Sequence, residues 1–364
     1  MPPPPEGRVS LEILFPNAGV SVSLPLLLLL GLILGTLSGF FGVGGGFLIT
    51  GGLLVFGVPP IFAVGTGLTL IMGSSIINTL KHRRLGNVDL KLGIFMVMGT
   101  MPALFLAERL NSALEAAGLA GPVIRYIYIL VLAALGLFMV YDHFKSRRSA
   151  GVQTGEISTA RLARRVQSLR IPPHSLRIPG FGSVPTYVSL PKSGIERLSV
   201  FVPVGVGFGV GFFAGLLGAG GGFILMPILI FVLGVPTTVA IGTDLFQIVI
   251  TGSVGTFLYS LSNHVDPLMV VIMLAAASAG TQLGTTATRF VEASRIRVMY
   301  GLTILSGSVA VGLEQAASVT GSDSFSSAAS FLLLGVAGTM CLIILGLLIK
   351  AEKSGQTAPA TGHH

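Results

Sequence analysis

Long apolar stretches alternate with short polar connections along almost the whole chain. Most of these stretches approach the roughly 20 residues that an α-helix needs to cross the hydrocarbon core of a bilayer. They lack the alternation of apolar and polar residues that membrane β-barrel strands show, so helices are expected to satisfy the backbone hydrogen bonds in lipid. We expect helical segments at about 22–42, 43–58, 61–80, 91–107, 123–143, 198–217, 219–234, 237–260, 267–287, 296–313 and 329–349.

Composition excludes most soluble classes of protein. Apolar residues make up 52% of the 364 residues and charged residues only 10%, whereas soluble domains carry roughly 25% charged residues. Nucleic-acid-binding domains, secreted disulfide scaffolds and disordered chains are therefore excluded. The single cysteine, Cys341, lies inside an apolar stretch, so we expect no cysteine-based metal site. The fold class is an all-α integral membrane protein, whose first apolar run is interpreted as a retained helix.

An internal repeat divides the chain into two halves. The glycine-rich stretch 35–48 matches 211–224, and shorter matches follow in register. These are Gly57-Val58-Pro59 with Gly234-Val235-Pro236, Ala63-Val64-Gly65-Thr66 with Ala240-Ile241-Gly242-Thr243, and Val88-Asp89 with Val265-Asp266. Self-similarity of this kind predicts homologous structural units. We expect a tail at 1–21, a first repeat at 22–143, a linker at 144–197, a second repeat at 198–313, a loop and extra helix at 314–349 and a tail at 350–364.

Positive charges indicate how the halves are oriented, because cytoplasmic loops are enriched in Lys and Arg. With five crossings per half the second half is inverted, and only Arg8, Arg109 and Arg125 lie opposite all other cations. Four crossings per half divide the cations more evenly. We therefore expect two inverted repeats in a cell (inner or plasma) membrane, with the N-terminus outside and the C-terminus in the cytoplasm. The basic linker is interpreted as a solvated connector near anionic lipids, with a regulatory role as the alternative.

Glycine clusters interrupt matching apolar segments of both halves, at 42–46 and 218–222. Each glycine weakens a helix by roughly 1 kcal/mol, so clusters of this density should break it. A half-helix that starts at Phe47 or Phe223 would direct its positive N-terminal end toward an anion. Paired interruptions point to a transporter site, and close helix packing is the alternative. Further glycines repeat at every fourth residue upstream of each cluster, which favours close helix packing there.

Polar residues in two other apolar segments, 61–80 and 237–260, are candidates to line the same site, with interhelical hydrogen bonding without substrate as the alternative. Asp244 is the ionisable residue that lies deepest in an apolar segment. A carboxylate at the centre of a membrane helix costs about 2.5–3.5 kcal/mol, so such residues often mark ion or proton pathways; a structural acid bonded to a helix N-terminus is the alternative. The candidate substrate-binding residues are Gly44, Gly45, Gly46, Phe47, Thr66, Ser74, Asn78, Gly220, Gly221, Gly222, Phe223, Thr243, Gln247 and Thr251, with Asp244 as the candidate proton-coupling residue.

These motifs together resemble the TauE/SafE family of sulfite exporters, also called TSUP. The resemblance rests on the repeated Gly-x-Gly-Gly-Gly-Phe-Leu/Ile, Gly-Val-Pro and Ala-Val/Ile-Gly-Thr elements and on the Arg-Arg-Leu-Gly-Asn-Val-Asp run at 83–89. It covers nearly the whole chain apart from the linker and tails, and it implies a permease for sulfite, an organosulfonate or a related small anion. The chain departs from the family's usual Gly-Thr-Ser, because Gly67 and Asp244 stand in the third position. Pro227 follows the second glycine cluster, whereas Gly51 takes that place in the first half.

The expected function is secondary transport, with the anion bound near the midplane between the halves and a proton as the candidate coupling ion. The expected partners are the anion, the lipid bilayer and protons, with no nucleic acid, cofactor or metal, and the oligomeric state is left open. An enzyme is not expected, since all six histidines lie in loops or at segment ends and neither Gly-x-Ser-x-Gly nor His-Glu-x-x-His occurs. An anion channel and a membrane-embedded ligand sensor are the alternatives.

Overall fold

The structure is a computed structural model that describes residues 11–42, 45–148, 163–168, 175–178, 182–291 and 293–353. Gly44 and the side chain of Phe47, both candidate site residues, lie outside what is described. So do parts of the expected tails and linker. Every predicted helical segment is confirmed, and eight helices among the described residues are long and apolar enough to cross a membrane.

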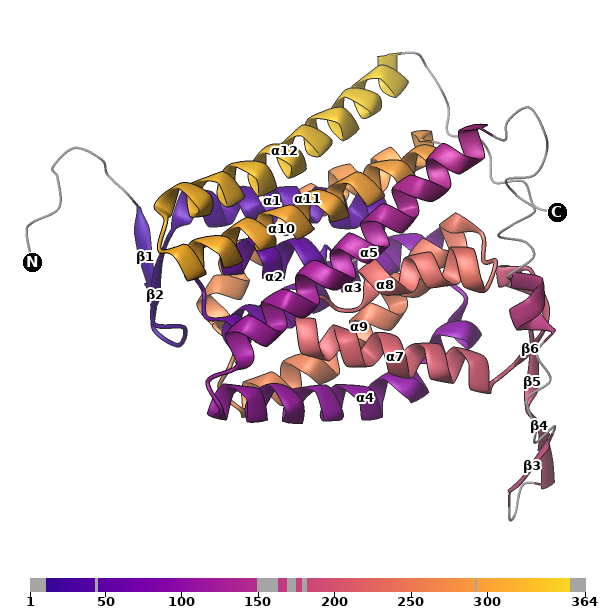
Figure 1. Cartoon of the computed structure of the whole chain (residues 1–364). Coiled ribbons are helices and arrows are strands. Elements are labelled where there is room, and N and C mark those ends of the chain that lie inside the picture. The colour runs from indigo at the N-terminus through magenta and orange to yellow at the C-terminus, as the bar shows by residue number, and fades with distance from the viewer. Residues whose placement is uncertain are drawn as a thin grey trace, which may run out of the picture.

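In each half one helix leads into the glycine cluster and a shorter helical segment follows it. Three long helices come next (Figure 1). The first half comprises α1 (Leu24–Phe41), α2 (Gly46–Val55), α3 (Pro60–Arg84), α4 (Leu90–Ala116) and α5 (Ala120–Arg148). The second comprises α7 (Phe201–Leu217), α8 (Gly222–Pro227) with a π-helix at Ile228–Val232, α9 (Thr237–Leu261), α10 (Pro267–Ala287) with a 3-10 turn at Thr288–Phe290, and α11 (Ala293–Thr320). The extra helix α12 (Asp323–Lys353) follows α11 almost directly, so the connection is shorter than the loop expected after residue 313.

Three short β-hairpins are elements that the apolar pattern does not predict. β1 (Glu12–Phe15) pairs with β2 (Val20–Ser23), β3 (Ser175–Ile178) with β4 (Gly182–Pro185), and β5 (Tyr187–Leu190) with β6 (Ile195–Ser199), all antiparallel. A short 3-10 turn, Pro191–Ser193, lies between β5 and β6. The β1–β2 hairpin lies at one end of the helical bundle and the other two lie at the opposite end (Figure 1). The linker that was expected to be solvated therefore ends in a folded hairpin.

Glycine stripes let helices of the two halves approach closely, as the sequence predicts. α1 lies against α10, and its counterpart α7 lies against α4. A Cβ atom at Gly35 would overlap the backbone of Ala277, and a Cβ atom at Gly207 would overlap the backbone of Met96. Only glycine fits at such backbone contacts, so the prediction that these stripes serve packing is confirmed.

The remaining long helices pair across the molecule and run in opposite directions. Along α3 and α9, Gly65 near the start of one contacts Tyr259 near the end of the other, and Gly252 contacts Met72. α5 and α11 also run antiparallel. The Ser308 hydroxyl donates to the Ile129 carbonyl at 2.9 Å on this interface. Each of these pairs joins corresponding helices of the two halves.

The outer surface of the bundle is apolar. Large hydrophobic side chains remain exposed on its helices, for example Phe331 (81%), Leu342 (70%) and Leu130 (68%). In water such exposure over many helices would be unfavourable, whereas lipid chains are a suitable solvent for it. Many Thr, Ser, Asn, Gln and Asp side chains are instead buried between the helices. This distribution is the one expected of a membrane-spanning bundle with a polar interior.

Candidate functional site

Both glycine clusters break their helices, which confirms the prediction from sequence. α1 ends at Phe41 and Gly42 adopts φ 72°, while Gly45 adopts φ 71° directly before α2. In the second half α7 ends at Leu217, and Gly218, Gly220 and Gly221 have φ of 67°, 68° and 78°. Residues with side chains rarely adopt these left-handed conformations. We call these two helix breaks the glycine turns; they are represented by Gly42, Gly45 and Gly46 in the first half and by residues 218–222 in the second.

The helices that follow the glycine turns are too short to cross a bilayer alone. α2 has ten residues, about 15 Å at 1.5 Å per residue, roughly half of the ~30 Å hydrocarbon core. It returns along α1, because Gly45 packs against the Leu34 carbonyl and Ser38, and Gly52 packs against Leu30. The described part of the expected segment 43–58, which begins at Gly45, therefore forms the second arm of a helical hairpin rather than a full crossing.

The two glycine turns meet in the interior. A Cβ atom at Gly46 would overlap the backbone of Ala219, so these turns are in direct contact. The Thr50 hydroxyl donates to the Gly218 carbonyl at 3.1 Å, and the Tyr128 hydroxyl donates to the Gly46 carbonyl at 3.5 Å. We call this region the central site. It brings Gly46 of the first glycine turn against the second glycine turn.

Asp244 faces the central site from α9. It lies one turn from Ile241 and one turn from Ile248, whose side chains contact Gly42 and Gly220. The carboxyl group is completely buried, and neither of its oxygens has a hydrogen-bond partner among the described residues. The alternative of a structural acid bonded to a helix N-terminus is therefore not what the structure shows. A buried carboxyl group without a partner is costly, which is typical of functional sites.

Three residues of the central site were not predicted from sequence: Thr50, Tyr128 and Tyr300. The Tyr128 ring stacks on Phe223 with centroids 6.5 Å apart, and the Tyr300 ring packs against Phe41 at 5.2 Å. Tyr300 also lies within electrostatic range of Asp244 and Tyr128. A sequence signal was present, because both tyrosines stand three residues after an arginine at corresponding points of α5 and α11.

The polar stripes of α3 and α9 are buried, and their side chains contact neighbouring helices. Gln247 Nε2 donates to the Thr100 hydroxyl at 2.8 Å, and Asn78 Nδ2 donates to the Ser38 hydroxyl at 3.2 Å. Within the described part of the chain, the side-chain carbonyl oxygens of Gln247 and Asn78 have no hydrogen-bond partner. The hydroxyl groups of the other two predicted residues donate to carbonyls of their own helices, Ser74 to Ile71 and Thr251 to Gln247.

The two signature threonines contact connecting loops instead of the glycine turns. The Thr66 hydroxyl accepts a hydrogen bond from the backbone N–H of Asp266, and Thr243 accepts one from Asp89, both at 3.0 Å. Neighbouring residues link them to the central site, because Val64 packs against Gly218 as Ile241 packs against Gly42. Among the described residues no three His, Cys, Asp or Glu side chains are grouped as a metal site would require.

Comparison with known proteins identifies the family. Residues 27–311 match the family described as sulfite exporter TauE/SafE. The chain belongs to this family. The TauE/SafE match includes both glycine turns, Asp244 and both tyrosines of the central site.

Curated relatives carry transporter names. A Bacillus subtilis protein named "Probable membrane transporter protein YunE" is 24% identical over 78% of this chain and 95% of its own length. A "Probable membrane transporter protein" of Xylella fastidiosa is 26% identical over 77% of this chain and 92% of its own length. No solved structure matches the chain significantly. This TauE/SafE protein is a multi-pass membrane transporter.

Proposed function

We propose that this TauE/SafE protein is a secondary transporter for a small anion, with sulfite or an organosulfonate as the substrate class. The observation that carries the proposal is the meeting of the two glycine turns at the central site. Turns of this kind leave backbone N–H groups without helical partners, and such groups bind anions. The family description, sulfite exporter, supports the choice of a sulfur-containing anion.

The proposed mechanism is alternating access between two inverted repeats. A twofold axis in the membrane plane exchanges the halves and reverses their direction, so a helix paired with its own counterpart must run antiparallel to it. Both self-paired sets, α3 with α9 and α5 with α11, run antiparallel. An axis along the membrane normal would make these pairs parallel. The helix directions therefore support the inverted arrangement, as the positive charges do.

Asp244 is proposed to couple transport to a proton. Its carboxyl group is buried beside the glycine turns without a hydrogen-bond partner, so it binds and releases a proton at the place where the anion would sit. A protonated carboxyl group donates a hydrogen bond to an anion, whereas a carboxylate repels it. Protonation and anion binding would thus favour each other.

The test is uptake of sulfite and sulfoacetate into proteoliposomes, with and without a pH gradient. The wild-type protein should accumulate one of these anions when a gradient is imposed. Asp244→Asn, which keeps the shape but cannot release a proton, should abolish the response to the gradient. Asp323→Asn, at an exposed acid on α12, is the matched control and should behave as wild type.

Three other outcomes would contradict all or part of this proposal. A conductance that does not saturate with anion concentration and is unchanged in Asp244→Asn would establish a channel. Binding without flux would establish a sensor. Gradient-driven uptake that persists in Asp244→Asn would contradict the coupling role and leave the anion site in place.

A further inference from the structure

The hairpins β1–β2 and β5–β6 are counterparts, one preceding the first helix of each half. Their turns have the related sequences Pro16-Asn17-Ala18-Gly19 and Pro191-Lys192-Ser193-Gly194. Gly19 and Gly194 both have positive φ, 67° and 68°. Phe15 and Leu190, directly before the turns, are both completely buried. The likeness between the two halves therefore extends upstream of residues 22 and 198, to a hairpin in each half.

The hairpin of the second half docks on the α3–α4 connection of the first half. The Ser193 hydroxyl donates to Asp89 Oδ2 at 2.7 Å. Asp89 Oδ1 accepts from the Leu92 N–H at 3.2 Å, which caps the start of α4. The backbone N–H of Asp89 donates to the Thr243 hydroxyl at 3.0 Å. Asp89 thus joins its own helix to a hairpin and a threonine of the other half.

The hairpin of the first half makes the same arrangement with Asp266 of the second half. The Ala18 N–H donates to Asp266 Oδ2 at 3.4 Å, and the Met269 N–H donates to Asp266 Oδ1 at 3.1 Å. The backbone N–H of Asp266 donates to the Thr66 hydroxyl at 3.0 Å. We call the two sets of contacts the Asp89 junction and the Asp266 junction. Both aspartates are buried, with 4% and 1% of their surface exposed.

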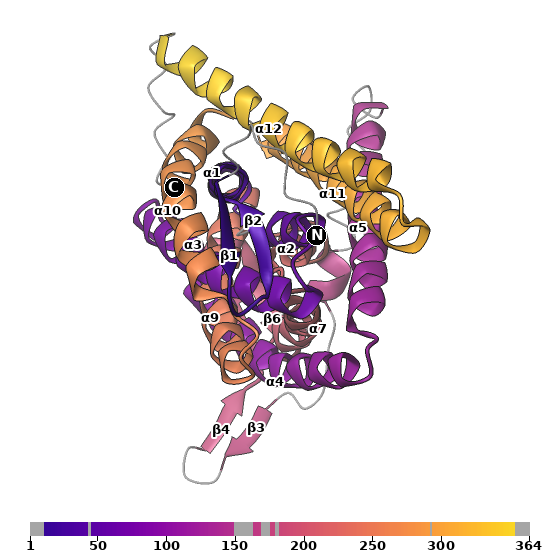
Figure 2. The same ribbon diagram turned by 90° about the vertical axis from the view of Figure 1, so that its left-hand side faces the viewer.

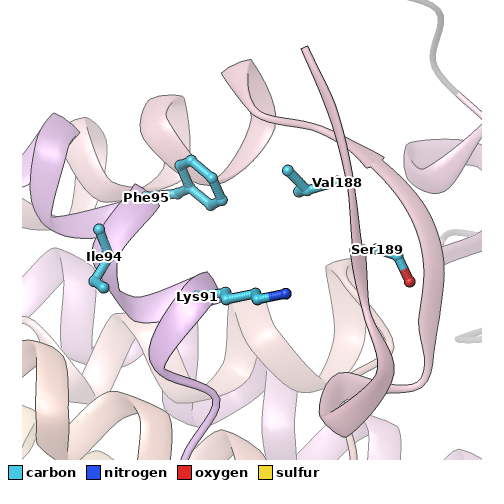
Figure 3. A pocket seen from close by; sticks show the side chains of 5 residues that line it. All are labelled: Lys91, Ile94, Phe95, Val188 and Ser189. Carbon is cyan, nitrogen blue, oxygen red and sulfur yellow. The ribbon is translucent and has the colours of Figure 1, made fainter. Parts of the chain in front are cut away.

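The two junctions lie at opposite ends of the bundle, where Figure 1 places their hairpins. Figure 2 views the bundle from the β1–β2 end, with that hairpin in front of the helices. Beside the Asp89 junction, a hollow of about 420 Å³ separates β5 from the first turns of α4. It is lined by Lys91, Ile94, Phe95, Val188 and Ser189, and the Lys91 side chain extends into it (Figure 3). The β5–β6 hairpin is therefore attached through its turn, at the Asp89 junction, and does not pack closely along α4 beside the hollow.

We propose that Asp89 and Asp266 are positioning residues of the transport cycle. Each keeps the hairpin of the other half docked at one end of the bundle, and the two junctions open alternately. The proposal rests on the alternating access proposed above. Each junction joins both halves, so relative movement of the halves must strain one of them. Because the junctions lie at opposite ends of the bundle, rocking of the halves that widens one end narrows the other and tightens its junction.

Hydrogen exchange of the reconstituted protein in lipid nanodiscs tests this without a substrate. Ser193→Ala removes the hydroxyl that binds Asp89 but leaves the cap of α4 intact. Loss of a hydrogen bond to a charged group should speed exchange of the 187–199 amides about tenfold. Exchange of the 12–23 amides should slow, by roughly twofold if both arrangements are about equally populated in the wild type.

Asp266→Asn is the variant for the opposite end. Its side-chain oxygen can still cap α10, but its NH₂ group would face the Ala18 N–H and cannot accept from it. Exchange should then speed up in 12–23 and slow down in 187–199. Ser189→Ala, in the same hairpin as Ser193, is the matched control. Its side chain is exposed and points away from Lys91 and Phe95 (Figure 3), so the change should alter exchange in neither hairpin.

Reciprocal changes at the two ends would support the proposal, because a merely structural contact would not slow exchange at the distant hairpin. Faster exchange confined to the altered hairpin, faster exchange in both, or no change in either would overturn it. A chain that shows reciprocal exchange yet moves no sulfite or sulfoacetate would contradict the proposed substrate while leaving the two junctions in place.

Discussion

At the scale of single residues, the buried polar groups of this TauE/SafE protein have two different surroundings. Thr66, Thr243 and Thr50 bond to backbone groups of the opposite half, so they hold the halves together. Asp244 and the carbonyl oxygen of Gln247 have no partner among the described residues. The first group is expected to govern stability, and the second is expected to govern function.

Thr243→Val should destabilise the protein by about 1–3 kcal/mol, because it leaves the buried N–H of Asp89 without an acceptor. Thr243→Ser keeps the hydroxyl group and should cost much less. Thermal unfolding in detergent measures the difference. Equal melting temperatures for the valine and serine variants would show that this hydrogen bond contributes nothing to stability.

At the scale of elements, close packing depends on glycine at defined faces of a helix. α7 offers a direct comparison, because Gly207 lies against the backbone of Met96, whereas nothing lies within 4 Å of a Cβ atom at Gly209. The two glycines are two residues apart in one helix, so any difference between them reflects tertiary contact.

Gly207→Ala should therefore cost about 1–3 kcal/mol through overpacking against α4. Gly209→Ala should be neutral or stabilise by up to about 1 kcal/mol, because alanine favours helix. Melting curves of the two variants in the same detergent check this. A Gly207→Ala protein as stable as the wild type would contradict the packing role of the stripe.

Sequence predicts the helices and their glycine breaks well, because hydrophobic length and glycine density are local properties. The hairpins are not predicted, since strands as short as β1 and β5 show too little alternation of apolar and polar residues to be recognised. The pairing of Thr66 with Asp266 could not be predicted either. It joins residues 200 positions apart and depends on how α3 crosses α9. Tyr128 and Tyr300 could have been predicted only by extending the sequence comparison of the two halves into α5 and α11.

At the scale of the whole molecule, the two ends of the bundle differ in charge. The end with β3–β6 also receives the basic C-terminal part of α3, with Lys81, Arg83 and Arg84. The end with β1–β2 receives the α4–α5 connection, which follows Ala116. On the positive-inside rule we propose that the first end faces the cytoplasm.

Side-specific labelling checks this orientation in a Cys341→Ser background. Arg84→Cys and Ala117→Cys place single thiols at two exposed positions. A membrane-impermeant maleimide should label Ala117→Cys in intact cells and Arg84→Cys only after permeabilisation. The wild-type chain is the control, because its Cys341 is buried. Labelling of Arg84→Cys in intact cells would contradict this orientation, and labelling of both thiols from one side would contradict a membrane-crossing α4.

The π-helix at Ile228–Val232 sets the two halves apart. It follows Pro227, whereas Gly51 occupies the matching place in α2, which remains a regular α-helix. A protein with two identical halves would spend equal time facing either compartment in the absence of a driving force. If the two halves alternate as proposed, their inequality would give the empty protein a preferred resting side. The gradients alone would still set the direction of net flow, but the apparent affinity and the rate measured from the two sides of the membrane would differ.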